Sequence, residues 1–226
     1  MVRKDIKNLH LSVYPPKGRV RVAAPLAMSD DAVRVAVIGK LGWIRRQREA
    51  FKRQPRLAEP EAVSGESLYL FGKRYRLRVV TIDGRTQVLV PNKTRVELHV
   101  RDGASDNDRL TALDRWYRKE LRAALTPLVD QWEPALGVSA RFWGVKRMKT
   151  KWGSCNSADR RIWVNSELAK KPLSCLEYIV VHELIHICEP KHNERFISLM
   201  DTHLPDWPQR RTLLNTSPLA HEDWTY

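Results

Sequence analysis

The sequence predicts a mixed α+β fold, with a β-rich N-terminal portion and a more helical remainder. Two patterns support this prediction. Short runs in which apolar and polar residues alternate, separated by turn residues, recur within residues 10–100 and are typical of strands. From residue 106 onward, long segments have apolar residues every three or four positions, which indicates helices.

The N-terminal portion is predicted to contain a hairpin and then a helix. Residues 10–25 alternate on both sides of a Pro-Pro-Lys-Gly turn signal, which predicts two antiparallel strands. Residues 29–51 are predicted to be helical, with Ser29 as the N-cap, acidic residues in the first turn and basic residues in the last. Residues 52–66 are rich in proline and charge and predict a linker.

The remainder of the chain is predicted to combine a sheet with several helices. Residues 67–100 alternate like strands broken by Asp83-Gly84 and Pro91-Asn92, which predicts a small antiparallel sheet. Apolar periodicity and the intervening turn residues predict a long helix over 106–136, strands over 138–148 and 160–165, and helices over 172–189 and 193–204.

Lysine and arginine give the chain a net charge of +14 and a pI of about 10.0. The basic residues are densest in residues 44–56 and 141–151. Such an excess favours contact with polyanions and says nothing about the fold. A possible partner is therefore nucleic acid, bound weakly and without sequence preference, with Arg45, Arg46 and Arg48 among the contributing residues.

Three cysteines without a CxxC pair predict neither a disulfide framework nor a cysteine-based zinc site. Cys155 and Cys188 are expected to be small buried residues. The longest apolar runs are much shorter than the ~20 residues needed to cross a bilayer. The sequence therefore predicts a cytoplasmic protein without a membrane partner, and it leaves the oligomeric state open.

Residues 178–192, YIVVHELIHICEPKH, place three histidines and a glutamate in an otherwise apolar helix. His182 and His186 are four positions apart, which puts them ~40° apart in azimuth and ~6 Å apart in rise. Their imidazoles can therefore bind one ion. Glu183 projects to the side, where it can reach a water molecule beside the metal without becoming a ligand. This HExxH spacing predicts a zinc ion with Glu183 as the general base.

A catalytic zinc ion needs a third protein ligand. His192 is the leading candidate, because Pro190 ends the helix and lets the chain turn back toward the metal. Glu194 is the alternative, because its carboxylate lies nearby in the sequence. A structural zinc site is more often rich in cysteine and closed by four protein ligands, so this pattern favours catalysis.

With these residues, the chain resembles the YgjP-type, SprT-like zinc metallopeptidases of the zincin superfamily. The resemblance rests on four stretches in the same order: KTKWGSC (149–155), IWVN (162–165), YIVVHELIHI (178–187) and KHNERF (191–196). It implies that residues 61–226 hold a sheet and a zincin-like metallopeptidase domain. Residues 1–60 would then form a separate basic hairpin and helix.

The resemblance implies that His182, His186 and His192 bind Zn²⁺ and that Glu183 is the catalytic acid/base. It also implies that the KTKWGSC and IWVN strands border the active site, where one sheet edge faces an extended protein or peptide substrate. The candidate groove residues are Trp152, Gly153, Ser154 and Asn165.

The predicted function is zinc-dependent hydrolysis of peptide bonds. The alternative is a basic nucleic-acid-binding protein whose zinc site is structural or catalytically idle. Glu183 speaks against this alternative, because a closed site has no use for a carboxylate beside the first ligand. Lys151, His203 and Tyr178 are all chemically able to stabilise the oxyanion, and the sequence does not choose among them.

Overall fold

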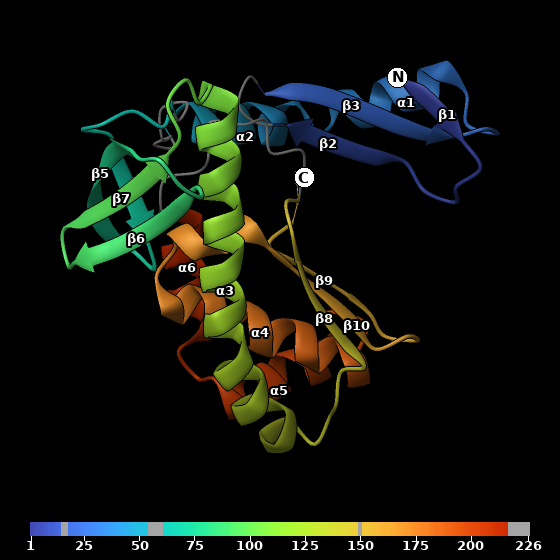
Figure 1. The fold of residues 1–226 in the computed structure, drawn as a ribbon. Coiled ribbons are helices and arrows are strands. Elements are labelled where there is room, and N and C mark those ends of the chain that lie inside the picture. Colours follow the sequence, from blue (N-terminus) through green and yellow to red (C-terminus); the bar gives the residue numbers. More distant parts are fainter. Residues whose placement is uncertain (15–17, 54–60, 149–150, 217–226) are drawn as a thin grey trace. The chain divides into compact units, whose positions relative to one another are not determined.

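The protein is described from a computed structural model, in which the fold is mixed α+β, as the sequence predicts (Figure 1). The described residues are 1–14, 18–53, 61–148 and 151–216. They belong to two compact units, one within Met1–Ala58 and the other within Glu59–Ser217. Among the described residues, no helix is both long enough and apolar enough to span a membrane.

The first unit contains a three-stranded sheet. Its strands are β1 (Val2–Lys4), β2 (His10–Tyr14) and β3 (Arg19–Pro25), in the order β1-β3-β2. The antiparallel pairing of β2 with β3 confirms the predicted hairpin. The strand β1, which pairs with β3 in parallel, was not predicted from the sequence.

Two helices of the first unit replace the single helix predicted over residues 29–51. These are α1 (Asp30–Ile38) and α2 (Leu41–Arg53). Ser29 caps α1 as predicted, because its side chain accepts a hydrogen bond from the Ala32 backbone N–H at 3.2 Å. The break falls at Gly39, where glycine costs helical stability and the chain can turn into a second helix.

The second unit begins with a four-stranded sheet. Its strands are β4 (Ser67–Leu70), β5 (Lys73–Thr81), β6 (Gln87–Asn92) and β7 (Arg95–Val100), in the order β4-β5-β7-β6. The prediction of an antiparallel sheet was wrong for one pair, because β5 and β7 run parallel. The strand β7 buries Val96, Leu98 and Val100 and so takes an inner position, whereas the largely exposed β6 lies at the edge.

The predicted long helix is confirmed as α3 (Asp106–Leu136), which Pro127 does not interrupt. A capping box begins it: Ser105 accepts from the Asp108 backbone N–H, and the Asp108 side chain accepts from the Ser105 backbone N–H. The buried face of α3 consists of large apolar side chains, namely Leu113, Trp116, Tyr117, Leu121, Leu125 and Trp132.

A second, three-stranded sheet follows α3. Its strands are β8 (Phe142–Lys146), β9 (Gly153–Asn156) and β10 (Arg161–Asn165), in the order β8-β10-β9. The strand β10 is parallel to β8 and antiparallel to β9. Local patterns predicted β8 and β10 and indicated a turn over residues 153–159, whereas the strand that the family resemblance implied within residues 149–155 overlaps β9.

The chain ends in a cluster of helices around α4. They are the 3₁₀ helix η1 (Ser166–Lys170) and the α-helices α4 (Leu173–Cys188), α5 (Glu194–His203) and α6 (Trp207–Thr216). The helix α4 starts after Pro172 and stops before Pro190, as predicted, whereas η1 and α6 were not predicted. Most of α4 is buried, and it packs against α3, α5, α6 and β9.

The turn between β4 and β5 contacts η1 and Pro172, the residue before α4. The Phe71 backbone N–H donates to the Ala169 carbonyl at 2.8 Å. Gly72 has a φ of +78°, and a Cβ atom there would lie 3.0 Å from Pro172 Cγ. This turn therefore connects the four-stranded sheet to η1 and to the residue that begins the helix carrying the histidines.

Gly72→Ala is expected to lower the free energy of unfolding by about 1–3 kcal/mol, because it adds left-handed backbone strain and a contact with Pro172. Gly103→Ala is the matched control, since Gly103 also has a positive φ, +72°, but no atom within 4 Å of the added Cβ. Urea unfolding of both variants measures the difference. Equal losses would show that the contact with Pro172 contributes nothing.

Candidate metal and active site

Three histidine rings meet near the C-terminal end of α4. His182 and His186 lie on α4, and His192 lies beyond the end of the helix. One nitrogen from each ring lies within 4.8 Å of the others, and the Nε2 atoms of His182 and His192 are 3.0 Å apart. Two nitrogens on one tetrahedral zinc ion would be ~3.3 Å apart. The three rings therefore fit a single metal ion.

The chain returns to the helix because α4 stops before a proline. The Nδ1–H of His186 donates to the Glu189 carbonyl at 3.0 Å. Because a carbonyl can only accept, this bond fixes the proton on Nδ1 and leaves Nε2 of His186 free to bind a metal. Asn193 then caps α5 by accepting from the Phe196 backbone N–H at 3.0 Å.

Phe196 packs against all three histidines. Its ring centroid lies 4.9 Å from that of His182, 4.8 Å from His186 and 4.7 Å from His192. The side chain is buried. Phe196 was not predicted to be part of the site, although its position four residues after His192 was the available signal. Phe196 therefore gives the cluster an apolar wall that restricts the orientation of the rings.

Burial favours the neutral form of His182 and His186. It lowers the pKa of His182 to about 3, helped by the neighbouring charges of His186, His192 and Arg211. Burial also lowers the pKa of His186, although the hydrogen bond to Glu189 opposes this. A metal ligand must be a neutral imidazole, so both rings are in the required form at neutral pH.

Glu183 lies directly against the sheet. Its side chain is 5% exposed, and a Cβ atom on Gly153 would lie 2.4 Å from its Oε1 atom. The backbone of β9 can approach the carboxyl group this closely only because residue 153 has no side chain. Burial raises the pKa of Glu183 to about 8, and the positive charge of Lys151 opposes the shift. A metal cation nearby would further favour the ionised carboxylate.

Tyr178 packs behind the first histidine. Its ring meets that of His182 edge-on at 5.8 Å and stacks on Trp207 of α6 at 6.4 Å, with 13° between the ring planes.

The three residues predicted as able to stabilise the oxyanion have different surroundings. Lys151 is exposed and acts electrostatically on Glu183, whereas Tyr178 is buried among rings and His203 ends α5.

The candidate groove residues have different surroundings. Gly153 contacts Glu183, and Ser154 follows it on the edge strand β9. Asn165 is fully buried, and its Nδ2 donates to the carbonyls of Met148 at 2.9 Å and Lys151 at 2.8 Å. Asn165 therefore holds the chain that leads into β9. Trp152 is also buried, with the Lys171 ammonium 5.6 Å from its ring centre.

Other predicted residues lie outside the histidine cluster. Glu194 begins α5, is exposed, and does not belong to the group of converging ligand atoms found among the described residues. The expectation of two buried cysteines was wrong, because Cys155 is half-buried and Cys188 is exposed at the last position of α4. Burial raises the pKa of Cys155 to about 11, so it carries a thiol rather than a reactive thiolate.

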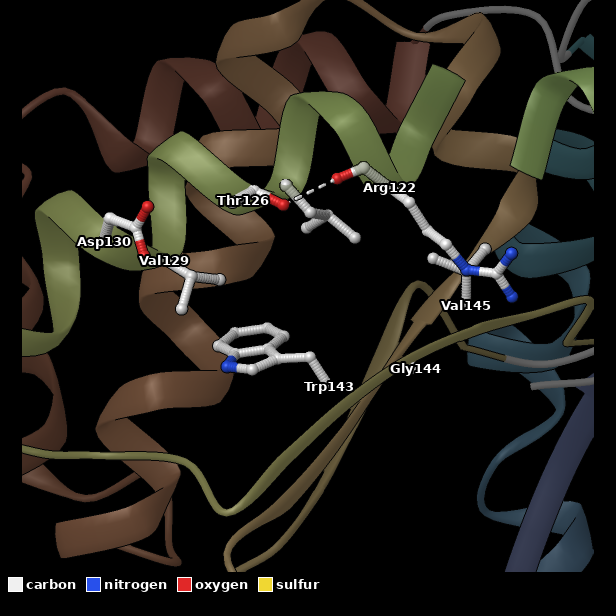
Figure 2. A pocket seen from close by; sticks show the side chains of 8 residues that line it. Arg122, Thr126, Val129, Asp130, Trp143, Gly144 and Val145 are labelled. Carbon is white, nitrogen blue, oxygen red and sulfur yellow. Dashed lines mark hydrogen bonds between the residues drawn. The ribbon is translucent and has the colours of Figure 1, made fainter. Parts of the chain in front are cut away.

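A cavity of about 340 Å³ lies elsewhere, between α3 and β8 (Figure 2). Its lining residues include the apolar Leu125, Val129 and Trp143 and the charged Arg122 and Asp130. None of the three histidines lines it. The cavity is therefore separate from the candidate metal site.

The helix α4 carries the HExxH pattern, and its two histidines converge with His192 in a cluster that could hold a metal ion. Residues 7–217 match the model of the YgjP-like family, described as a YgjP-like metallopeptidase domain. Because the match spans most of the chain, the protein belongs to the YgjP-like metallopeptidase domain family. This confirms the family that the sequence stretches indicated.

Comparison with solved structures found the crystal structure of the metallopeptidase zymogen of Pyrococcus abyssi abylysin. The two chains share 15% sequence identity, and the match covers 42% of this chain and 96% of that chain with a TM-score of 0.37. Comparison with curated proteins found no match.

His192→Ala is expected to reduce metal retention strongly, because it removes one of three converging nitrogens. Glu194→Ala, which removes the exposed carboxylate two residues later, is expected to retain the metal. Mass spectrometry of metal content after dialysis compares the two variants with the unaltered protein. The reversed result would identify the carboxylate as the third ligand.

Gly153→Ala is expected to reduce peptide hydrolysis by about 100-fold while metal content stays near that of the unaltered protein. The added methyl group would displace the Glu183 carboxylate, and a misplacement of about 1 Å in an active site can cost that much. Single-turnover kinetics with a peptide substrate, together with a metal assay, tests this. Unchanged hydrolysis would show that Glu183 can shift without loss.

Proposed function

We propose that this protein is a zinc-dependent peptidase in which His182, His186 and His192 bind Zn²⁺ and Glu183 is the general base. The observation that carries the proposal is the position of Glu183. Its buried carboxyl group lies on the turn of α4 that carries the metal-binding rings, and the β9 backbone fixes it from the other side. A site built only to hold a metal would not need to bury this group.

Zinc suits the donor set. Three imidazole nitrogens are good ligands for a borderline-soft ion, and three protein ligands leave one tetrahedral position open. When bound, the ion supplies a Lewis acid that polarises the scissile carbonyl and makes water more acidic. The cysteines do not join the histidine cluster among the described residues, so the site differs from cysteine-rich structural zinc sites.

Glu183 performs the proton transfers in this proposal. Its carboxylate accepts a proton from the attacking water and then donates it to the nitrogen of the leaving amine. Contact with the Gly153 backbone restricts the carboxyl group to one position, which preorganises both transfers. Lys151, by its charge, favours the ionised form that the first transfer needs.

The substrate is proposed to be an extended segment of a protein or peptide. The strand β9 lies at one edge of its sheet, with β10 on its other side. The same strand contacts Glu183 through Gly153. A peptide that added to the free edge would lie beside the carboxylate and gain main-chain hydrogen bonds without sequence preference.

The second candidate function is binding of nucleic acid by a protein with an idle zinc site. The net charge of +14 favours it. It requires that Glu183 has no chemical role. It therefore does not explain why the Gly153 backbone lies so close to the Glu183 carboxyl group. A substitution that removes only the basicity of Glu183 separates the two functions.

Glu183→Gln is expected to reduce peptide hydrolysis by about 10²- to 10⁴-fold, the usual contribution of a general base. Zinc content and the urea unfolding midpoint are expected to stay near those of the unaltered protein, because the side chain keeps its shape. Glu194→Gln, the same chemical change at an exposed position, is the control and should retain activity.

Loss of zinc in Glu183→Gln would mean that Glu183 is a ligand or orients one. Hydrolysis at an unchanged rate would exclude Glu183 as the base. If neither the variant nor the unaltered protein hydrolyses unfolded substrates with zinc supplied, the nucleic-acid-binding function is favoured instead.

A further inference from the structure

The sheet that contacts Glu183 has a second, outward face. Side chains alternate between the two faces of a strand. Gly153 faces α4, so the strand residues on either side of it, and those on either side of its partner in β10, point away from α4. The register places Phe142 opposite Arg161, and Gly144 opposite Trp163, on this outward face. The face lies within the second compact unit and is formed by residues on β8, β9 and β10.

Two aromatic side chains dominate the outward face. The rings of Phe142 and Trp163 are 5.2 Å apart, centre to centre, with 59° between their planes. Phe142 is 39% exposed. Trp163 lies across the backbone of Gly144, where a Cβ atom would come within 2.3 Å of the indole ring. Glycine at this position therefore makes room for the indole to lie flat on the sheet.

Two exposed cations flank these rings. The Lys146 ammonium lies 4.4 Å from the centre of the Trp163 ring, and the Arg161 guanidinium lies 5.2 Å from that of Phe142. None of the three strands contains an acidic residue. The strands therefore combine two aromatic rings with two positive charges on the outward face, and the nearby carboxylate of Asp159, in the turn between β9 and β10, accepts a hydrogen bond from Asn156.

We propose that this outward face binds single-stranded nucleic acid, with bases stacking on Trp163 and Phe142 and phosphates contacting Lys146 and Arg161. Aromatic rings beside cations are the combination that binds single strands without sequence preference. A duplex keeps its bases stacked on one another and cannot place them on the rings. The net charge of +14 favours a polyanionic partner.

Lys146 must leave the Trp163 ring for a base to stack there. An exposed cation–π contact contributes only ~2- to 5-fold to an equilibrium. Stacking of one base on an aromatic side chain contributes ~5- to 150-fold, so the exchange favours binding. The displaced ammonium is then free to contact a phosphate on the same strand, which adds to the affinity.

The test uses the full chain and a fluorescein-labelled oligothymidylate of about 15 nucleotides, within the range of known single-strand sites. Fluorescence anisotropy measures the dissociation constant at several salt concentrations. Trp163→Ala is expected to weaken binding by ~10-fold, whereas Trp163→Phe, which keeps a ring, should lose less than ~3-fold. Binding of heparin, a polyanion without bases, should be the same in both variants as in the unaltered protein.

The charges are tested separately. Joint replacement of Lys146 and Arg161 by alanine should reduce the slope of log affinity against log salt by about 1.4, or ~0.7 per phosphate contact. Arg115→Ala with Lys119→Ala removes the same charge from the exposed surface of α3 and is the control. The control should leave the slope within about 0.5 of its original value.

Three results would overturn the proposal. The first is an unchanged oligothymidylate affinity in Trp163→Ala, with circular dichroism showing that the variant is folded. The second is an equal loss of slope in the α3 control, which would mean that net charge alone causes binding. The third is duplex DNA bound as tightly as the single strand.

Discussion

The close approach of the Gly153 backbone to the Glu183 carboxyl group is the contact on which the candidate site depends. It joins β9, an edge strand, to α4, a helix that is buried for most of its length. A side chain at residue 153 would occupy the space of the carboxyl group. The sheet and the helix therefore have to meet at this glycine for Glu183 to be both buried and fixed.

This arrangement has an energetic cost. An ionised carboxylate removed from water is unfavourable, which is why burial raises the pKa of Glu183 to about 8. Burial of the imidazoles is less costly, because the same desolvation favours their neutral, metal-binding form. The surroundings of α4 thus oppose charge on Glu183 unless a cation is near. Lys151 supplies one such charge, and a metal held by the histidines would supply a larger one.

The parts of the site that follow from local geometry could be predicted from the sequence. The spacing of His182 and His186, and the proline that ends α4, are properties of one helix and its terminus. The contact between Gly153 and Glu183 was missed, because it depends on segments some 30 residues apart coming together. The parallel pairing of β5 with β7 was missed for the same reason, since alternation indicates a strand without indicating its partner.

On each face of the β8-β10-β9 sheet, a glycine lets another side chain come close to the strand backbone. On the inner face Gly153 lets the strand backbone approach a carboxyl group, and on the outer face Gly144 lets an indole ring lie on the backbone. The two glycines lie on the outer strands β9 and β8, and β10 pairs with both. A shift in the register of β10 by one residue would turn Trp163 inward and leave Gly144 without the ring that lies over it. The register of this one strand therefore decides the aromatic pair on the outer face, whereas the contact between Gly153 and Glu183 depends on how β9 packs against α4.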